Sequence, residues 1–345
     1  MLGVAVGYGS IAFIRPLGYG KQFAVFVLVV VLATLWDSPH RFNSSGPPPF
    51  LKEWWTKIPD MNTGRRYLGV AVGDGKLFAV GGDDTGNNRF KSGEYLDLKN
   101  VDAGWKKLPD MDTKRSYLGV AVGGGKLFAV GGVGEKSGEY LDLNKMDAGW
   151  TKLPDMDTKR YALGVAVGDG KLFAVGGEDG ANYLKSGEYL DLKNVDAGWT
   201  KIPDMYMKRW ALGVAVGDGK LFAVGGSDSN VYYHNCLKSV EYLDLKNVDA
   251  GWKKLLDMHT ERQYLGVAVG DGKLFAVGGY DGSNTLKSGE YLDLKNVDAG
   301  WKALPDMNTK KYALGVAVGD GKLFAVGGRD GGNTHKSGEY LRIAM

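Results

Sequence analysis

The sequence predicts an all-β fold, a six-bladed β-propeller of four-stranded antiparallel blades, and three observations support this prediction. The phrase GDGKLFAVGG, first seen at residues 73–82, returns five more times with at most one change. From each repeated tryptophan to the second glycine of the following diglycine is always 27 residues. Each unit has four strand-like segments and none with a helical period, so neighbouring units must cover one another's faces.

The first two segments of a unit are predicted to form a hairpin. YLGVAVG (residues 67–73) is small and apolar, and KLFAV (residues 76–80) is a second run suited to a strand. Between them, Asp74-Gly75 is the residue pair that a two-residue primed turn requires. The diglycine ends the second strand, because residues without Cβ adopt backbone angles closed to others. We place this hairpin nearest the axis, where crowding favours Gly, Val and Ala.

The outer half of a unit follows a connection of variable length. The interval from the diglycine to the glutamate of SGEYLDL runs from 7 to 15 residues, so this connection is predicted to lie open to solvent. SGEYLDL is expected to be the third strand, KNVDAG a connector and GWKKLPDM the fourth strand. The tryptophan of the fourth strand and the phenylalanine of KLFAV are expected to fill the space between blades.

The offset of the repeats predicts how the ring closes. The chain begins with a fourth-type strand, EWWTKIPDM at residues 53–61, and ends with a third-type strand, SGEYLRI at residues 337–343. Pairing of these two strands completes the sixth blade and leaves no exposed sheet edge. We therefore divide the chain into an N-terminal segment at residues 1–52 and a propeller at residues 53–345.

These repeats resemble the kelch motif. A diglycine ends a strand, Glu and Asp occupy the next strand, a tryptophan follows, and Met and Arg precede the following first strand, in six registered copies. Two departures are present: Leu96-Asp97 stands where the family has a Tyr-Asp pair, and the interval to the tryptophan is longer than usual. The resemblance implies a β-propeller that binds partners at one end.

The N-terminal segment is predicted to carry targeting information. Residues 23–36 are uncharged and mostly apolar and follow Arg15 and Lys21, which resembles a signal-peptide core or short signal anchor more than a full membrane span of ~20 residues. Asn43-Ser44-Ser45 is a glycosylation sequon if the chain enters the secretory route. The expected location is membrane-anchored or secreted, with membrane attachment through residues 23–36.

An alternative origin of the N-terminal segment is left open. Residues 1–9 and 18–25 echo the two strands of the inner hairpin. Under this alternative hypothesis, the segment is a degenerate seventh copy or a mispredicted gene start, and the expected location of the chain is the cytoplasm.

Ligand-binding residues are expected in the loops after the diglycine and before the first strand, where the kelch resemblance places partner binding. The second set of loops carries a repeated cation, at Arg65, Arg115, Arg160, Arg209, Arg262 and Lys311. Five flanking positions are also basic: Arg66, Lys114, Lys159, Lys208 and Lys310. A closed ring that set these cations around one mouth would attract acidic groups. The alternative role is structural, with each cation paired to a strand acid such as Glu94 or to a backbone carbonyl.

An aromatic residue follows each repeated cation by one or two positions. The six are Tyr67, Tyr117, Tyr161, Trp210, Tyr264 and Tyr312. Tyrosine beside arginine is typical of binding hot spots and of surfaces that stack on sugars, and packing between blades is the alternative for rings that face inward.

The longest variable loop, residues 227–238, breaks the symmetry of the repeats. It alone contains Tyr232, Tyr233, His234 and Cys236. This asymmetry favours a part in specific binding, and the alternative is tolerated drift of a single loop.

Composition and motif content argue against several functions. A net charge of +3 on 43 basic and 40 acidic residues gives no reason to expect nucleic-acid binding. The single cysteine excludes an intrachain disulfide and a multi-thiolate zinc site. The propeller's histidines, His234, His259 and His335, lie on different blades, so a copper site like that of galactose oxidase is not expected. Near-identical blades also leave few unique carboxylates for sialidase-like chemistry.

The sequence thus predicts a non-enzymatic binding or scaffold protein without a cofactor. Its monomeric propeller is expected to recognise a protein or peptide partner of acidic character. A carbohydrate-binding propeller at the cell surface is the second hypothesis, and an enzyme resembling galactose oxidase or a sialidase is the third. Residues 1–52 are too short for the BTB domain of ubiquitin-ligase adaptors.

Overall fold

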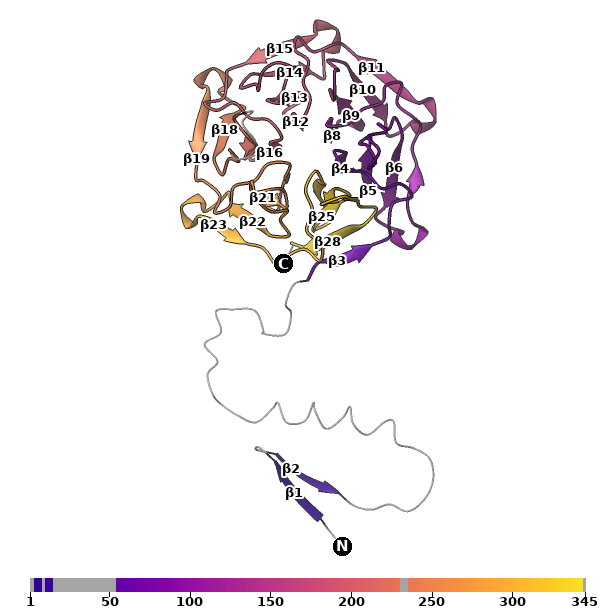
Figure 1. The fold of residues 1–345 in the computed structure, drawn as a ribbon, viewed down its shortest axis with the longest axis vertical. Coiled ribbons are helices and arrows are strands. Elements are labelled where there is room, and N and C mark those ends of the chain that lie inside the picture. Colours follow the sequence, from indigo (N-terminus) through magenta and orange to yellow (C-terminus); the bar gives the residue numbers. More distant parts are fainter. Residues whose placement is uncertain (1–2, 8–9, 15–53, 230–234, 344–345) are drawn as a thin grey trace. The chain divides into compact units, whose positions relative to one another are not determined.

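The computed structural model describes residues 3–7, 10–14, 54–229 and 235–343. Contacts between residues divide the chain into two units, Met1–Lys52 and Glu53–Met345, and each is described by itself. In the described part of the larger unit, six four-stranded sheets are arranged radially as the blades of a closed ring (Figure 1). The predicted all-β, six-bladed propeller is confirmed.

Each blade is a meander of four antiparallel strands, the first nearest the centre of the ring and the fourth at its rim. The first blade is β4 (Gly69–Gly73), β5 (Lys76–Val80), β6 (Gly93–Asp97) and β7 (Lys106–Lys107). The next four are β8 (Gly119–Gly123), β9 (Lys126–Val130), β10 (Gly138–Asp142) and β11 (Trp150–Leu153); β12 (Gly164–Gly168), β13 (Lys171–Val175), β14 (Gly187–Asp191) and β15 (Trp199–Ile202); β16 (Gly213–Gly217), β17 (Lys220–Val224), β18 (Val240–Asp244) and β19 (Trp252–Leu255); and β20 (Gly266–Gly270), β21 (Lys273–Val277), β22 (Gly289–Asp293) and β23 (Trp301–Ala303).

The inner hairpin has the two-residue turn that its sequence predicts. β4 pairs with β5 from Gly69↔Val80 to Gly73↔Lys76, which leaves only two residues between the strands. These residues, Asp74 and Gly75, have φ of 48° and 66°. Positive φ at both positions is what a type I′ turn requires, and this turn matches the twist of the paired strands.

The innermost strands are packed too closely for larger side chains. A Cβ added to Gly69 would overlap the side chain of Val120 on β8, the inner strand of the next blade. The same overlap recurs at every blade boundary, and at the last one Gly315 faces Val70. Crowding near the axis therefore explains why the first strand reads Gly-Val-Ala-Val-Gly.

Hydrophobic side chains fill the space between neighbouring blades, as predicted. Phe78 of β5 packs with Leu118 and Leu127 of the next blade in one buried cluster. At the rim, Nε1 of Trp105 donates a hydrogen bond of 2.8 Å to the carbonyl oxygen of Pro59, just after the outer strand of the preceding blade. Equivalent bonds are made by Trp55, Trp150, Trp199, Trp252 and Trp301. The repeated tryptophan thus ties each outer strand to its neighbour.

The ring closes where the offset of the repeats predicted. The sixth blade is β24 (Gly315–Gly319), β25 (Lys322–Val326), β28 (Gly338–Arg342) and β3 (Thr56–Ile58). β3 pairs with β28 in antiparallel register, with Ile58 opposite Gly338. The closing strand is also tied to the fifth blade, because Nε1 of Trp55 donates to the carbonyl oxygen of Pro305 at 2.9 Å. The two ends of the propeller therefore share one sheet.

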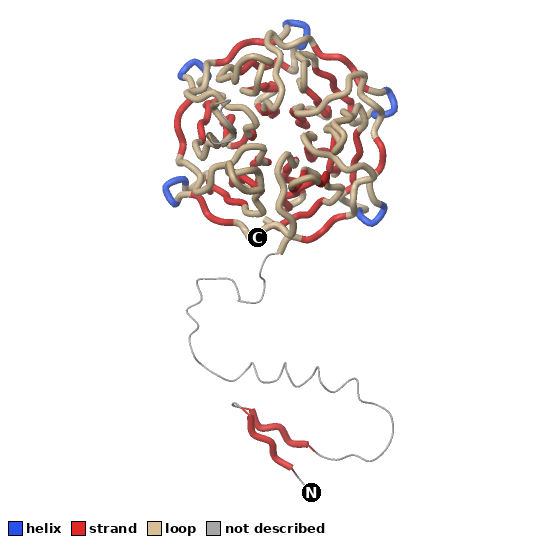
Figure 2. Tube along the Cα trace, viewed as in Figure 1, coloured by secondary structure: helices blue, strands red, loops and turns tan. Residues whose placement is uncertain are grey.

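The connector between the third and fourth strands forms a short 3-10 turn at the rim (Figure 2). In the first five blades the turns are η1 (Val101–Ala103), η2 (Met146–Ala148), η3 (Val195–Ala197), η4 (Val248–Ala250) and η5 (Val297–Ala299). Gly104 ends η1 with φ of 69°, a backbone angle that favours glycine. These turns take up the longer interval before the tryptophan.

The smaller unit contains one hairpin in its described part. β1 (Gly3–Gly7) pairs with β2 (Ser10–Ile14) in antiparallel register from Gly3↔Ile14 to Gly7↔Ser10. Residues 18–25, 23–36 and 43–45, on which the targeting and seventh-copy hypotheses depend, lie outside the described residues. In the stretches that the structure describes, no helix is long and apolar enough to cross a membrane.

Candidate binding site

The repeated cations are buried inside the blades. Arg65 is 1% exposed, and its guanidinium donates hydrogen bonds to Oε1 of Glu94 and to the carbonyl oxygens of Gly81 and Ser92. The other five, equally buried against the matching acids, are Arg115, Arg160, Arg209, Arg262 and Lys311. The prediction that these cations form a basic mouth open to a ligand is therefore wrong, because they are buried and paired with glutamates of their own blades.

The glutamate that pairs with each repeated cation also accepts hydrogen bonds from the loop before the first strand. Oε2 of Glu94 accepts hydrogen bonds from the backbone N–H and the side-chain amide of Asn62, both at 2.8 Å. Oε1 accepts from the backbone N–H of Thr63. Because this loop comes from the outer strand of the preceding blade, the Arg–Glu pair joins consecutive blades. A buried pair satisfied on both sides in this way is a structural part of the repeat.

The flanking cations are divided between one buried, paired arginine and four exposed lysines. Arg66 is 6% exposed, and its Nε lies 2.7 Å from Oδ1 of Asp83. Its Nη2 donates to Oδ1 of Asn87, also at 2.7 Å. The exposed flanking cations are Lys114, Lys159, Lys208 and Lys310. Of the cations expected around the mouth, only these four lysines are exposed, so a preference for acidic partners would depend on them and not on the repeated cations.

Lys311 makes fewer hydrogen bonds than the arginines at the matching positions. Its Nζ donates to the carbonyl oxygen and Oγ of Ser337, at 3.0 and 3.2 Å, and lies 3.8 Å from Oε1 of Glu339. The arginines also reach the carbonyl oxygen of the first glycine of the diglycine, as Arg115 does at Gly131. Burial lowers the pKa of Lys311 to about 8, against the opposing effects of Glu339 and Asp60.

We expect Lys311→Arg to raise the free energy of unfolding by about 1–2 kcal/mol, because a guanidinium at this position also reaches the carbonyl oxygen of Gly327. The lowered pKa supplies a second readout. Between about pH 8 and the ordinary value of 10.5, the unfolded chain binds more protons than the folded chain, so the free energy of unfolding of the native chain rises with pH. Urea denaturation across this range measures both effects.

The arginine variant should be the more stable chain near neutral pH and should lose the rise in alkali. Because Lys311 is charged in both states below its folded pKa, its titration adds nothing to the comparison near neutral pH, which reports the net effect of exchanging the buried ammonium for a guanidinium. A variant no more stable than the native chain would contradict this account of the position.

A closed ring of backbone hydrogen bonds surrounds the axis just before the inner strands. Each blade contributes one residue with positive φ, whose N–H donates to the carbonyl oxygen of the matching residue in the preceding blade. The six are Tyr67, Tyr117, Ala162, Ala211, Tyr264 and Ala313, with φ of 52–58° and N···O distances of 2.8–2.9 Å. A left-handed backbone is costly for residues with a side chain, so the surrounding fold must fix it. Sequence reasoning did not anticipate this ring.

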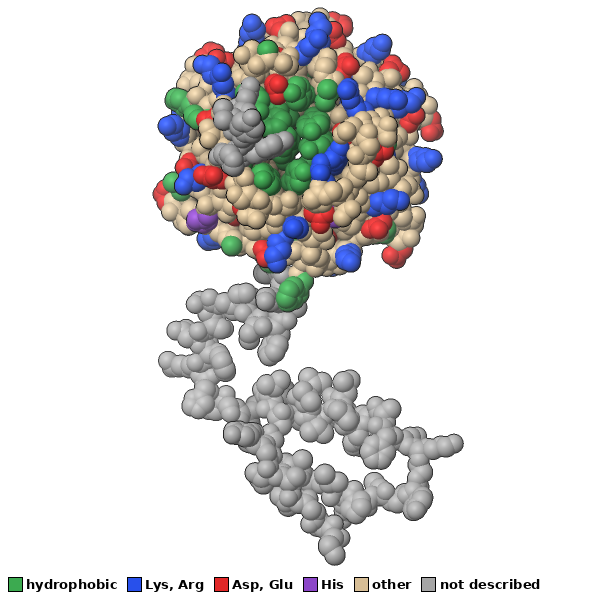
Figure 3. Space-filling model, viewed as in Figure 1, with side chains coloured by type: hydrophobic (Ala, Val, Ile, Leu, Met, Phe, Trp, Pro, Cys, Tyr) green, Lys and Arg blue, Asp and Glu red, His purple; other side chains and the backbone are tan. Residues whose placement is uncertain are grey.

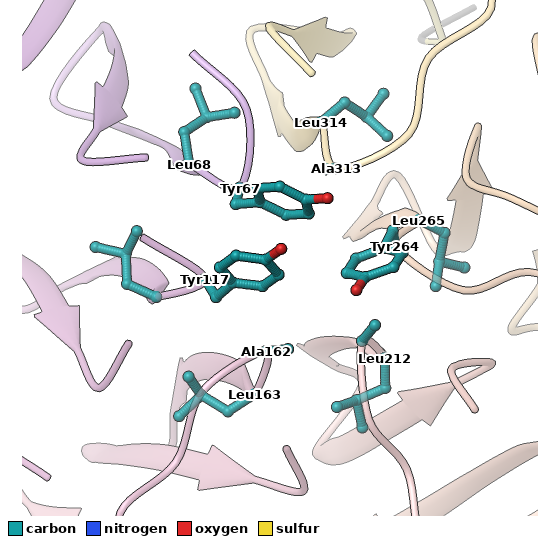
Figure 4. A pocket seen from close by; sticks show the side chains of 12 residues that line it. Tyr67, Leu68, Tyr117, Ala162, Leu163, Leu212, Tyr264, Leu265, Ala313 and Leu314 are labelled. Carbon is teal, nitrogen blue, oxygen red and sulfur yellow. The ribbon is translucent and has the colours of Figure 1, made fainter. Parts of the chain in front are cut away.

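Three of these residues are tyrosines, and their rings gather over the axis (Figure 4). Tyr67 and Tyr117 stack with centroids 3.7 Å apart and an interplanar angle of 13°. Tyr264 meets both edge-on, at 5.4 and 6.2 Å. Burial, together with the neighbouring Tyr67, raises the pKa of Tyr117. Alanines hold the other three positions and leave room beside the rings.

The other three predicted aromatics stand one position earlier and surround this group. Tyr161 lies edge-on to Tyr117, with ring centroids 6.1 Å apart. Burial is the main cause that raises the pKa of Tyr161, and its hydrogen bond with Glu178 is the second. Tyr264 is met by Trp210 at 4.9 Å and by Tyr312 at 6.0 Å. The structure therefore brings all six aromatic residues together.

Two further tyrosines join this cluster from the variable loops. Tyr183 stacks on Trp210 with centroids 5.2 Å apart, and Tyr280 lies 6.1 Å from Tyr312. Sequence reasoning missed both, although each is an aromatic residue in a loop after a diglycine. We call the eight residues the aromatic mouth: Tyr67, Tyr117, Tyr161, Tyr183, Trp210, Tyr264, Tyr280 and Tyr312.

Two hollows lie at the aromatic mouth. One, of about 110 Å³, is bounded by the three axial tyrosines and by leucines such as Leu68 and Leu163. The other, of about 350 Å³, is lined by Tyr67, Tyr117, Tyr264, Tyr280, Tyr312 and Arg329. The space-filling view shows hydrophobic side chains at the centre of this face and most Lys and Arg side chains farther out (Figure 3). The mouth is thus an aromatic surface more than a charged one.

The longest variable loop is described only in part. Tyr232, Tyr233 and His234 lie outside the described residues. Cys236 is buried, and its Sγ lies 3.5 Å from the carbonyl oxygen of Tyr280 in the next blade. Burial raises the pKa of the Cys236 thiol to about 12. The described end of the loop therefore packs beside the aromatic mouth without presenting a reactive thiol.

The described histidines sit apart from one another. His259 lies 3.2 Å from Glu290, and His335 lies 3.4 Å from Asp330, in different blades. Across residues 54–229 and 235–343, no three His, Cys, Asp or Glu side chains come together as metal ligands. The aromatic mouth offers a ligand stacking surface and phenol groups, and the larger hollow adds the guanidinium of Arg329.

Comparison with known proteins agrees with the blade geometry. The family model described as the kelch motif matches residues 64–111, 159–206, 211–247, 261–308 and 311–342. The chain belongs to the kelch family. The second blade of this kelch propeller falls between the first two matches and has the same four strands, β8 to β11. Kelch propellers generally bind protein partners.

The solved structures add a likeness of fold. The structure of YjhT is 13% identical to this kelch chain with a TM-score of 0.67, over 81% of this chain and 95% of that chain. At this identity the likeness supports the propeller fold alone. Among the curated proteins, none matches the sequence.

Proposed function

We propose that this kelch propeller is a non-enzymatic binding protein that holds a segment of a partner protein on the aromatic mouth. The observation that carries the proposal is the gathering of an aromatic residue from every blade at one end of the ring. Tyrosine and tryptophan supply large contact areas at a low cost in side-chain entropy, which is why they are enriched at binding hot spots.

The axial tyrosines are not needed to close the ring. Alanine takes the same left-handed position in three blades and makes the same backbone hydrogen bonds. Tyr67, Tyr117 and Tyr264 therefore add half-buried aromatic surface that the fold can do without. A contiguous apolar patch on the surface of a propeller is most simply explained by a partner that covers it.

The triple variant Tyr67→Ala, Tyr117→Ala, Tyr264→Ala tests the proposal. Because alanine is native at the matching position of the other blades, we expect the variant to fold and to melt within a few degrees of the native chain. Affinity capture by the native chain, followed by titration of the recovered protein in purified form, should show at least a tenfold loss of affinity in the variant, about 1.4 kcal/mol.

Tyr206→Ala is the matched control, because it removes a tyrosine that is 62% exposed and lies outside the aromatic mouth. It should bind as the native chain does. Equal recovery of the same partners by the native chain and the triple variant would contradict the proposal. Glycan binding that the triple variant loses, with no protein partner lost, would instead favour the carbohydrate hypothesis.

A further inference from the structure

The described residues that line the larger hollow at the aromatic mouth include an arginine but no acid. Among these described lining residues, Arg329 is the one that is not a tyrosine. It begins β26 (Arg329–Asp330), which pairs with β27 (Asn333–Thr334) in the loop after the last diglycine. Among the described residues no carboxylate forms an ion pair with Arg329. The other mouth arginine, Arg66, is already neutralised by Asp83.

Contacts along one side hold Arg329 at the lip of the hollow. Its guanidinium carbon lies 5.3 Å from the ring centroid of Tyr312. Nε donates a 3.0 Å hydrogen bond to the carbonyl oxygen of Gly331, and Nη2 donates to the same atom. Two backbone hydrogen bonds of 2.9 and 3.0 Å keep Arg329 beside Tyr312. The protein's described part offers Nη1 no acceptor, so the guanidinium is held in place with one end available to a ligand.

This lining selects for one kind of ligand chemistry. Tyrosine faces favour a flat or apolar body, and a guanidinium that becomes covered needs a planar anion, which a carboxylate supplies with two oxygens. A cationic group would meet Arg329 with no acid among the described residues that line the hollow. A neutral group would cover the guanidinium and leave its charge unpaired, which costs binding energy.

We infer that the hollow binds a carboxylate carried next to an aromatic or aliphatic group of the partner, with Arg329 as the residue that determines specificity. This inference rests on the proposed function and names the chemistry recognised at the same mouth. The preference for acidic partners that the sequence suggested thus returns with a different cation. That cation comes from a variable loop of one blade, so it breaks the sixfold symmetry and fixes the direction in which a segment lies across the mouth.

The matching loop position differs in every blade. The residues directly after the diglycine are Asp83, Val133, Glu178, Ser227, Tyr280 and Arg329. Only the sixth blade presents a cation there. Serine at this position in the fourth blade shows that the fold accepts a small neutral side chain, so Arg329→Ser removes the charge with a native precedent.

Three small probes test the inference on the full chain by NMR titration. They are N-acetyltryptophan, which has a terminal carboxylate, N-acetyltryptophanamide, which is neutral, and acetyl-Trp-Glu-amide, whose carboxylate is on a side chain. We expect at least one carboxylate probe to bind at least tenfold more tightly than the amide, and this preference to weaken as salt is added. The tighter of the two carboxylate probes identifies whether a chain end or an acidic side chain is recognised.

Arg329→Ser should bind the preferred carboxylate probe no more tightly than the amide, and Arg329→Lys should keep part of the preference. Arg89→Gln is the control, because it removes an exposed arginine from the first-blade loop that does not line the hollow. Equal affinity for carboxylate and amide probes, no binding of any probe, or a preference retained by Arg329→Ser would overturn the inference. Tighter binding of methyl glucuronide than of the tryptophan probes would also overturn it and assign the hollow to an acidic sugar.

Failure of this inference and failure of the proposed function give different results. If the hollow does not select carboxylates, the triple tyrosine variant should still lose its protein partners. If the mouth does not bind partners at all, that variant retains them whatever the probes do.

Discussion

Replacing Arg209 by methionine should lower the free energy of unfolding by about 3–5 kcal/mol. Arg209 is 0% exposed, and its guanidinium donates to Oε1 of Glu241 at 2.8 Å and to the carbonyl oxygens of Gly225 and Ser239 at 2.8 and 2.9 Å. Methionine fills much of the volume but leaves a buried carboxylate without its cation. Breaking one side of such a pair is among the most damaging single changes, because the remaining charge is uncompensated.

Urea denaturation of the full chain measures this effect, and two variants interpret it. Lys208→Met removes the exposed neighbouring cation and should change stability by no more than about 0.5 kcal/mol. Arg209→Met combined with Glu241→Gln removes the stranded charge and should recover part of the loss. If Arg209→Met were as stable as Lys208→Met, the repeated cation would be free for a ligand, as the sequence first suggested.

Deleting residues 54–61 should lower the stability of the whole propeller by about 5–9 kcal/mol. The segment contains β3 and three core side chains, Trp55, Ile58 and Met61, that are 4%, 6% and 1% exposed. Losing the burial of three large apolar side chains accounts for a loss of this size. The deletion also exposes the edge of β28 and the surfaces of the first and fifth blades against which Ile58, Met61 and Trp55 pack, so its effect should not stay within one blade.

The blade was predictable because its signals are local and repeat in register. Asp74-Gly75 specifies a primed turn without reference to the rest of the chain, and the fixed spacing from Trp55 to the diglycine leaves one arrangement of the strands. The offset between residues 53–61 and 337–343 then determined closure. Each of these inferences used residue type and spacing alone, and the structure bears them out.

Whether the side chains of the repeated cations point into the blades or toward solvent was harder to predict. Arginine beside tyrosine describes a binding surface and a buried pair equally well, and charge alone does not say which way a side chain points. The useful signal was present, because an acid recurs in register with every cation, as Glu139 does with Arg115. Two opposite charges that recur together in every blade indicate a structural pair. An asymmetric ligand would contact only some of the blades and would not require the same cation in all six.

The sequence contains weaker signals for two other features, the ring of residues with left-handed backbone and the lining of the larger hollow. Positive φ at Tyr67 or Ala162 has no mark in the sequence, because neither residue favours that conformation and only the closed ring imposes it. Tyr280 and Arg329 lie in loops without a shared length, so spacing could not bring them to one place. The specific part of the site therefore depends on the closed ring.

Thermal unfolding of two equally long deletions tests ring closure most directly. One chain lacks residues 54–61, and the other lacks residues 37–44 from the N-terminal segment. We predict that the first melts about 10 °C or more below the intact chain, or loses its cooperative transition, and that the second melts as the intact chain does. A chain without residues 54–61 that melts as sharply and at the same temperature as the intact protein would contradict the closed ring on which the mouth depends.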